Sequence, residues 1–130
     1  GVGDEGYRTV FEEVLIPLGD AWRPELVVVS AGFDAHHTDP LGRMQLTEAG
    51  FGRLTSLLQE AAGRWCGGRV VLVLEGGYDP RGLPRCVEAT LRVLAGLGGP
   101  APAGHPEVPY AVVRERVRQV RRVLSTYWSL

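Results

Sequence analysis

The sequence contains no lysine, although basic side chains are not scarce. All 14 basic residues are arginines, and 15 acidic residues leave a formal net charge of -1. A charge this close to zero supplies no field that would steer the protein toward nucleic acid or an acidic membrane. We therefore expect no direct nucleic-acid partner and no membrane partner, and we interpret the missing lysine as coding bias.

Cysteine and long apolar runs are also scarce. Cys66 and Cys86 form no C-x-x-C motif and are too few for a disulfide framework, so we expect a reducing location, cytoplasmic or, in a eukaryote, also nuclear. No apolar run approaches the roughly 20 residues that span a bilayer, and the start, GVGDEGY, lacks the pattern of a signal peptide. Since the chain begins at Gly1 and its one methionine is Met44, we expect a processed product or a piece of a longer protein.

The apolar residues that are present follow an α/β pattern. Spacings of three and four predict helices over residues 7–22, with a kink or early end at Pro17, and over 47–63, with Thr47 as N-cap. Further helices are predicted from 83 to about Gly96 or Gly98 and over 112–127. The runs 26–29 and 69–75 are apolar on both alternate sets, which is typical of strands buried on both faces of a parallel sheet. Residues 99–109, rich in proline and glycine, read as a linker.

A strand, a helix and a second strand form a β-α-β unit, whose strands are parallel. Their carboxyl ends then lie at the same edge of the sheet, where ligands bind in open α/β sheets. Asp34 follows the first strand and Tyr78 the second, so we expect an acid and a phenol to face each other across one crevice. Because two strands make a poor sheet, we also expect part of the domain to lie outside this chain.

Asp34 has two interpretations. A loop aspartate often caps a turn or a helix. A carboxylate at the end of an apolar strand is also suited to binding a divalent cation, which compensates its charge. Asp34-Ala35-His36 has D-x-H spacing, but one acid and one histidine do not complete a zinc site of four ligands, or three and a water. We expect His36 and His37 to be solvated loop residues.

The stretch Glu75-Gly76-Gly77-Tyr78 follows the second strand. Its paired glycines either permit a tight turn or let a ligand approach the backbone closely. A tyrosine just beyond them is able to donate a hydrogen bond to an oxygen that gains negative charge. Other catalytic patterns are absent from the sequence: there is no G-x-S-x-G around Ser30, no phosphate-binding loop and no G-x-G-x-x-G after either strand.

Two segments in this order, VVVSAGFDAHHTDPLGRMQLTEAGF (residues 27–51) and VVLVLEGGYD (70–79), resemble the zinc-dependent histone deacetylases. The resemblance is strongest to the class II enzymes and their bacterial relatives, which include acetylpolyamine amidohydrolases. It implies an α/β fold with the three-layer parallel sheet of the arginase–deacetylase kind, present here as a partial domain. Residues 1–98 would be the carboxyl-terminal part of the catalytic domain, followed by the linker 99–109 and a carboxyl-terminal helix at 110–130.

The resemblance also implies roles for individual residues. Asp34 matches one of three protein ligands of a catalytic Zn²⁺ ion, and Tyr78 matches the tyrosine that hydrogen-bonds the substrate carbonyl and then the oxyanion. Gly76 and Gly77 match glycines that line the acyl-lysine channel, and Leu41 matches a leucine at its rim. Relatives that prefer acetylpolyamines can carry glutamate at this rim position, so Leu41 favours acetyl-lysine or another neutral acyl group.

Part of the family's site has no counterpart in this sequence. The other two zinc ligands of the family come from a D-x-H on an earlier strand, and its catalytic His-His pair lies earlier still. His36-His37 follows Asp34, so no role is carried over to it. We expect a parent enzyme that hydrolyses the acetylamide of acetyl-lysine in a protein or of an acetylpolyamine, and a chain that by itself binds zinc weakly and is inactive.

Two other functions remain open at this point. The chain could be a truncated, non-catalytic deacetylase-like module that binds a protein through the arginine-bearing last helix, although a solvated helix face is the simpler interpretation of those arginines. It could also be an unrelated α/β module that binds a nucleotide or small anion at its glycine turn.

Overall fold

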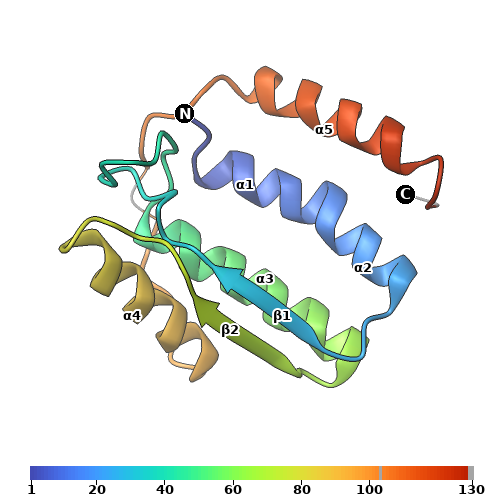
Figure 1. The fold of residues 1–130 in the computed structure, drawn as a ribbon, viewed down its shortest axis with the longest axis horizontal. Coiled ribbons are helices and arrows are strands. Elements are labelled where there is room, and N and C mark those ends of the chain that lie inside the picture. The colour runs from blue at the N-terminus through green and yellow to red at the C-terminus, as the bar shows by residue number, and fades with distance from the viewer. Residues whose placement is uncertain (103, 129–130) are drawn as a thin grey trace.

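The computed structural model, which describes residues 1–102 and 104–128, places helices around one pair of parallel strands (Figure 1). The elements are α1 (Asp4–Val10), a π-helical turn η1 (Phe11–Leu15), α2 (Ile16–Trp22), β1 (Val27–Ala31), α3 (Glu48–Cys66), β2 (Val70–Leu74), α4 (Gly82–Leu94) and α5 (Tyr110–Leu124). This order confirms the α/β class and the β-α-β unit. None of the helices in the described part of the chain is long and apolar enough to cross a membrane.

The two strands pair in parallel, with Val27 opposite Val70 and Ala31 opposite Leu74. In the described part of the chain, α3 and α4 cover one face of the pair and leave the other open (Figure 1). On the other face, Val28 is 62% exposed, Val71 48% and Val73 51%. The expectation that both faces are buried is therefore wrong for the described residues. The reason is that no described element packs over the second face.

The first helical segment is longer than predicted and passes through Pro17 without ending. Its path changes from α to π geometry at Phe11 and returns to α at Ile16, so that Pro17 lies at the start of α2. Proline in a helix interior normally clashes with the carbonyl four residues earlier and lacks an N–H to donate. A π turn shifts the hydrogen-bond pattern by one residue and accommodates the missing donor.

α3 begins as predicted and ends later than predicted. The Thr47 side chain accepts a hydrogen bond from the Gly50 N–H, at 3.1 Å, which confirms Thr47 as N-cap. Asp4 in turn accepts from the Thr47 backbone and hydroxyl, at 2.8 and 2.6 Å, and so ties α1 to α3. The helix continues past Gly63 to Cys66, and Gly67, with φ of 62°, terminates it.

The segment after α4 returns to the first helix. Glu107 accepts hydrogen bonds from backbone N–H groups of Gly3 and Gly6, at 2.9 and 3.2 Å, and so caps the amino terminus of α1. Beyond it, α5 packs along α1 (Figure 1) and buries Val113 and Val117. The boundaries proposed from the sequence for catalytic part, linker and last helix remain predictions.

A small core lies under the loops that follow the strands. It contains Phe33, Leu46, Phe51 and Cys86, and the Phe33 and Phe51 ring centroids are 5.0 Å apart. Burial raises the pKa of the Cys86 thiol to about 12, so this cysteine is a packing residue and not a nucleophile. The core holds the base of both loops.

Candidate functional site

The two loops that carry the predicted site residues lie side by side. Beyond the last paired residues, the Glu75 N–H donates to the Ala31 carbonyl at 3.2 Å and the Phe33 N–H donates to the Gly76 carbonyl at 2.9 Å. The parallel pairing thus extends into the loops. The two carboxyl ends meet at one edge of the sheet, as parallel topology requires.

Asp34 lies directly against the glycine turn. A Cβ atom added at Gly76 would come within 2.8 Å of the Asp34 Oδ2 atom, closer than real Cβ contacts. Because Gly76 has no side chain, the Asp34 carboxylate occupies the space that a Cβ at position 76 would fill. Gly76 itself is buried, while Asp34 is exposed. The structure therefore brings these two predicted site residues together.

Gly77 is required for both conformation and space. Its φ is 131°, a value that residues with a Cβ rarely adopt. An added Cβ would also meet the Leu83 Cδ1 atom at 2.8 Å and the Phe33 Cβ atom at 3.2 Å. The backbone at Gly77 is thus held tightly between the first loop and α4.

The side chains of Tyr78 and Leu41 are both exposed, at 54% and 71%. Their backbones share one partner, the carboxylate of Asp39. Its Oδ2 accepts from the Tyr78 N–H at 2.7 Å, and its Oδ1 accepts from the N–H groups of Leu41 and Gly42 at 2.8 and 2.9 Å. Asp39 was not among the site residues predicted from the sequence. The available signal was the stretch Asp39-Pro40-Leu41-Gly42, since aspartate side chains often bind backbone N–H groups two or three residues on.

Asp39 is buried and ionised. Burial by itself opposes ionisation, but the backbone hydrogen bonds to the carboxylate, that of Tyr78 foremost, outweigh this effect and hold the pKa of Asp39 below its usual range. At neutral pH the group is therefore an anion with hydrogen-bond donors on both oxygens.

A second link between the loops contains His36. Its Nδ1 lies 2.8 Å from the Thr38 Oγ1, and the Thr38 hydroxyl donates to the carboxylate of Asp79, the residue after Tyr78. The residue is only 2% exposed, so the expectation of a solvated His36 is wrong. The physical reason is that the loop folds inward over α3, bringing Nε2 to 3.6 Å from the Glu48 Oε2.

The two imidazoles differ in their surroundings. Burial, and then the neighbouring His37, lower the pKa of His36, so its ring is neutral at pH 7. His37 is half-buried, and its ring lies between those of His36 and His105, with centroids 4.3 and 4.2 Å away. The atoms nearest to a Cβ built at Gly76 or Gly77 belong to Asp34, Leu83 and Phe33, so neither imidazole is among the nearest neighbours of the glycine turn.

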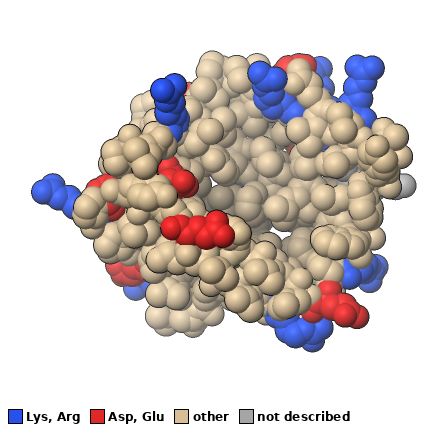
Figure 2. All heavy atoms as spheres, viewed as in Figure 1, with Lys and Arg blue, Asp and Glu red and all other residues tan. Residues whose placement is uncertain are grey.

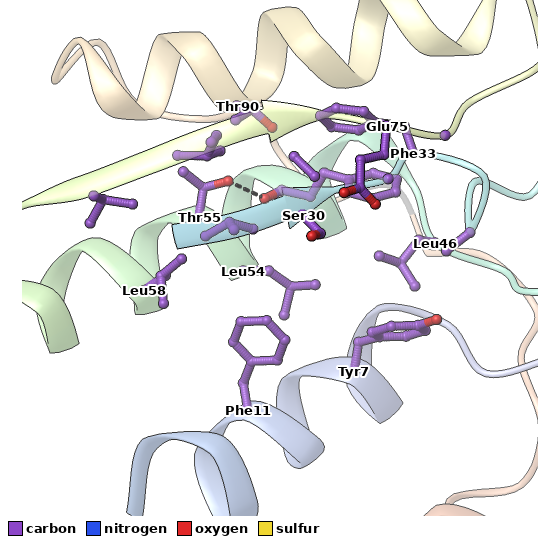
Figure 3. Close-up of a pocket in the computed structure, with 18 of the residues that line it drawn as sticks. Tyr7, Phe11, Ser30, Phe33, Leu46, Leu54, Thr55, Leu58, Glu75 and Thr90 are labelled. Carbon is purple, nitrogen blue, oxygen red and sulfur yellow. Dashed lines mark hydrogen bonds between the residues drawn. The ribbon is translucent and has the colours of Figure 1, made fainter. Parts of the chain in front are cut away.

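A cavity of about 420 Å³ opens beside this edge (Figure 3). Phe11 projects toward β1 from the first helical segment, and Tyr7, Asp34, Glu75 and Gly76 are also among the lining residues. Figure 2 shows a hollow at the centre of this face, with few charged atoms on its floor and acidic atoms at one side. Among the described residues that line the cavity, neither Tyr78 nor Leu41 is present.

Tyr7, predicted from the sequence only as part of a helix face, lines the cavity together with Asp34. Burial, and then the negative charge of Asp34, raise the pKa of its hydroxyl. Tyr7 therefore remains protonated and able to donate a hydrogen bond toward the cavity. No sequence signal indicated this proximity, because it depends on how α1 packs.

The family resemblance implies zinc, and the donor atoms in the described part of the chain do not by themselves form a zinc site. Within residues 1–102 and 104–128, no group of three or more histidine, cysteine or acidic residues is arranged to hold a metal ion. A catalytic zinc needs three protein ligands, and Asp34 offers one carboxylate. The ligand role of Asp34 remains a prediction.

Comparisons with known proteins agree with the α/β fold and with the two loops described above. The sequence model described as "Histone deacetylase domain" matches residues 1–94. "Histone deacetylase 10, chloroplastic" of Oryza sativa subsp. japonica is 39% identical, over 96% of this chain and 28% of its own length. "Polyamine deacetylase HDAC10" of Homo sapiens is 42% identical, over 99% of this chain and 18% of its own length.

A solved structure, the crystal structure of the HDA15 HD domain, superposes with a TM-score of 0.82 at 37% identity. The match covers 98% of this chain and 34% of that one. The chain thus spans 28% and 18% of the lengths of the two relatives above. Its fold corresponds to part of a longer α/β domain.

Proposed function

Because this chain belongs to the histone deacetylase family, we propose that it supplies one side of the active site of an enzyme that hydrolyses acetylamides. The contact that carries the proposal is the one between the Asp34 carboxylate and Gly76. It joins the acid and the glycine turn, the two motifs that define the family resemblance, at the sheet edge where ligands bind.

In this proposal each residue has a separate role. The Tyr78 hydroxyl donates a hydrogen bond to the carbonyl oxygen of the substrate, which becomes negatively charged during attack. Gly76 and Gly77 let an extended acyl-lysine chain pass close to the backbone, and Leu41 contacts it at the rim. Asp34 is one ligand of Zn²⁺, and the remaining ligands come from outside this chain.

The substrate that we propose is an acetylated lysine side chain in a protein, with an acetylpolyamine as the alternative. Leu41 presents an exposed apolar side chain and carries no charge that would attract a polyamine. The names of the relatives include both histone and polyamine deacetylases. The choice for acetyl-lysine therefore depends on the rim residue.

A non-catalytic interaction module is the second candidate. It is favoured by the single metal-ligand candidate at the sheet edge and by arginines on the surface of α5. Arg118 has 72% of its side chain exposed, and among the described residues its ion pair is with Glu115 of the same helix. One control tests this candidate and also the expected inactivity of the isolated chain. It is an assay of the chain apart from the full gene product.

The test compares Tyr78→Phe with unmodified protein, at the full length that its gene encodes. We expect kcat on a fluorogenic acetyl-lysine peptide to fall about 10²- to 10³-fold, with KM changed little, because one oxyanion donor is removed. Tyr127→Phe, which removes an exposed hydroxyl beyond α5, is the matched control and should leave kcat unchanged.

Three results would decide against parts of the proposal. Equal kcat for Tyr78→Phe and unmodified protein would exclude the role of Tyr78. A higher kcat/KM on acetylpolyamines than on the peptide would reverse the choice of substrate. A full-length protein that neither retains zinc nor hydrolyses either substrate would favour the interaction module.

A further inference from the structure

Asp39 connects the predicted rim of the site to the predicted catalytic tyrosine. We use the name Asp39 bridge for its carboxylate together with the N–H groups of Leu41, Gly42 and Tyr78, which bind it at 2.7 to 2.9 Å. Asp39 is 7% exposed. The bridge therefore lies under the surface, while the side chains of Leu41 and Tyr78 project from it.

The covalent chain alone does not hold these two loops in register. Tyr78 follows Asp39 by 39 residues, with α3 and β2 between them. The exposed side chains of Leu41 and Tyr78 have little packing to hold them in place. Hydrogen bonds to an ionised acceptor are stronger than those between neutral groups, so the bridge is a direct constraint on both backbones.

The bridge is also close to Asp34. A Cβ added at Gly42 would lie 1.8 Å from the backbone oxygen of Asp34, so the two backbones are in close contact. A displacement of Gly42 would therefore press on the Asp34 backbone. Through Gly42 the bridge is connected to the predicted metal ligand as well.

We propose that Asp39 is a positioning residue for the deacetylase site, which fixes the backbones of Leu41 and Tyr78 relative to each other. This inference rests on the proposed function. Asp39 touches no substrate and acts through Tyr78 and Leu41. Both carboxylate oxygens are needed, because N–H donors approach from two sides; asparagine would present an NH₂ group, itself a donor, to one of them.

Amide hydrogen exchange tests the bridge without any enzyme assay. In full-length protein carrying Asp39→Asn, we expect the Tyr78 amide to exchange at least about tenfold faster than in unmodified protein, because its charged acceptor is lost. Asp20→Asn is the matched control: it removes one carboxylate charge, hydrogen-bonded to Trp65 Nε1 on the far part of the molecule, and should leave the Tyr78 amide unchanged.

If the Asp39→Asn variant does not fold, amide exchange in the unmodified protein tests the bridge by itself. Protection of the Tyr78, Leu41 and Gly42 amides relative to an unstructured peptide supports the bridge. A Tyr78 amide that exchanges as fast as in such a peptide overturns it, and so does an exchange rate that Asp39→Asn leaves unchanged.

A double-mutant cycle separates positioning of Tyr78 from a general structural role. We expect Asp39→Asn to lower kcat about 10- to 100-fold, since small displacements of catalytic groups have effects of this size. In a Tyr78→Phe background the same substitution should lower kcat by a clearly smaller factor, because the hydroxyl that it misplaces is gone and only the effects through Leu41 and the Asp34 backbone remain. Equal losses in both backgrounds overturn the proposal.

The two proposals fail in different ways. If the full-length protein lacks deacetylase activity, the proposed function is wrong and there is no deacetylase site for Asp39 to position. If activity is present but the Tyr78 amide is unprotected, or the losses are additive, the function stands and the role of Asp39 is wrong.

Discussion

Burial and hydrogen bonding set the protonation states of the buried polar residues near the sheet edge. His36 is neutral because burial disfavours its charged form, and Asp39 is ionised because backbone donors outweigh burial. Burial of Glu48 opposes its ionisation, but a hydrogen bond from its own backbone N–H outweighs this and lowers the pKa of Glu48. A neutral imidazole and ionised carboxylates therefore lie close together and hold the two loops in place.

The lowered pKa of Asp39 predicts how stability depends on pH. The unfolded carboxyl titrates near 3.8 and the folded one lower, so its stabilising contribution is complete above about pH 5 and is lost progressively as pH falls through the unfolded and then the folded value. We expect Asp39→Asn to reduce the free energy of unfolding by about 1–3 kcal/mol at pH 7, since buried N–H groups lose their acceptor. Between pH 5 and 3 the variant should lose stability less steeply than unmodified protein, as checked by denaturant titrations; parallel pH profiles would contradict this.

Several site residues were predictable because a local pattern marks them. Asp34 and Tyr78 each follow an apolar strand, and the paired glycines stand out as Cβ-free positions. The orientation of the Tyr78 ring relative to Asp34 stays a prediction. Asp39 was missed because its importance depends on Tyr78, a partner far away in the sequence.

At the scale of the elements, the helical glycines show which helix surfaces are closely packed and which are open. On α2, a Cβ at Gly19 would lie 2.3 Å from carbons of the Trp65 ring on α3. On α3, Gly63 is exposed and has nothing within 4 Å of such a Cβ. The two positions are both helical, so alanine substitutions report packing rather than helix propensity alone.

We expect opposite effects from alanine at these positions. Gly63→Ala should stabilise the protein by about 0.5–1 kcal/mol, because alanine loses less backbone entropy in a helix. Gly19→Ala should destabilise it by about 1–3 kcal/mol, because the methyl group displaces the Trp65 ring. Thermal and denaturant unfolding measure both, and equal stability of the two variants would show that α2 and α3 do not pack in this way.

Helix existence was predictable from periodicity, whereas helix ends were less so. Pro17 suggested an early end, but the π turn before it relieves the clash that would have caused one. Gly63 suggested the end of α3, but a glycine terminates a helix only where a left-handed conformation follows, and Gly67 provides it. Backbone geometry, which composition does not encode, decided both ends.

At the scale of the whole molecule, the first and last helices form a pair held by Glu107. This carboxylate binds the free N–H groups at the start of α1, where the helix dipole also favours a negative charge. The segment 99–109 thus makes a specific contact although its composition is typical of a linker. α5 depends on this contact and on Val113 and Val117 for its position.

Removal of the Glu107 carboxylate should loosen α5. We expect Glu107→Ala to lower the free energy of unfolding by about 1–3 kcal/mol, and amides of α5 to exchange faster while those of α3 do not. Glu88→Ala, on the exposed surface of α4, is the control and should change neither quantity much. Unaltered exchange in α5 would show that burial of its valines suffices to hold it.

The sequence by itself determined the β-α-β order, the parallel pairing and the meeting of Asp34 with the glycine turn. These follow from local periodicity and from the rule that parallel strands end at one edge. Only the tertiary structure decided that Asp39 joins the rim to Tyr78, that His36 is buried, and that Glu107 caps α1. Each of these depends on partners brought together by packing, and hydrogen bonds across such distances leave no periodic trace in a sequence.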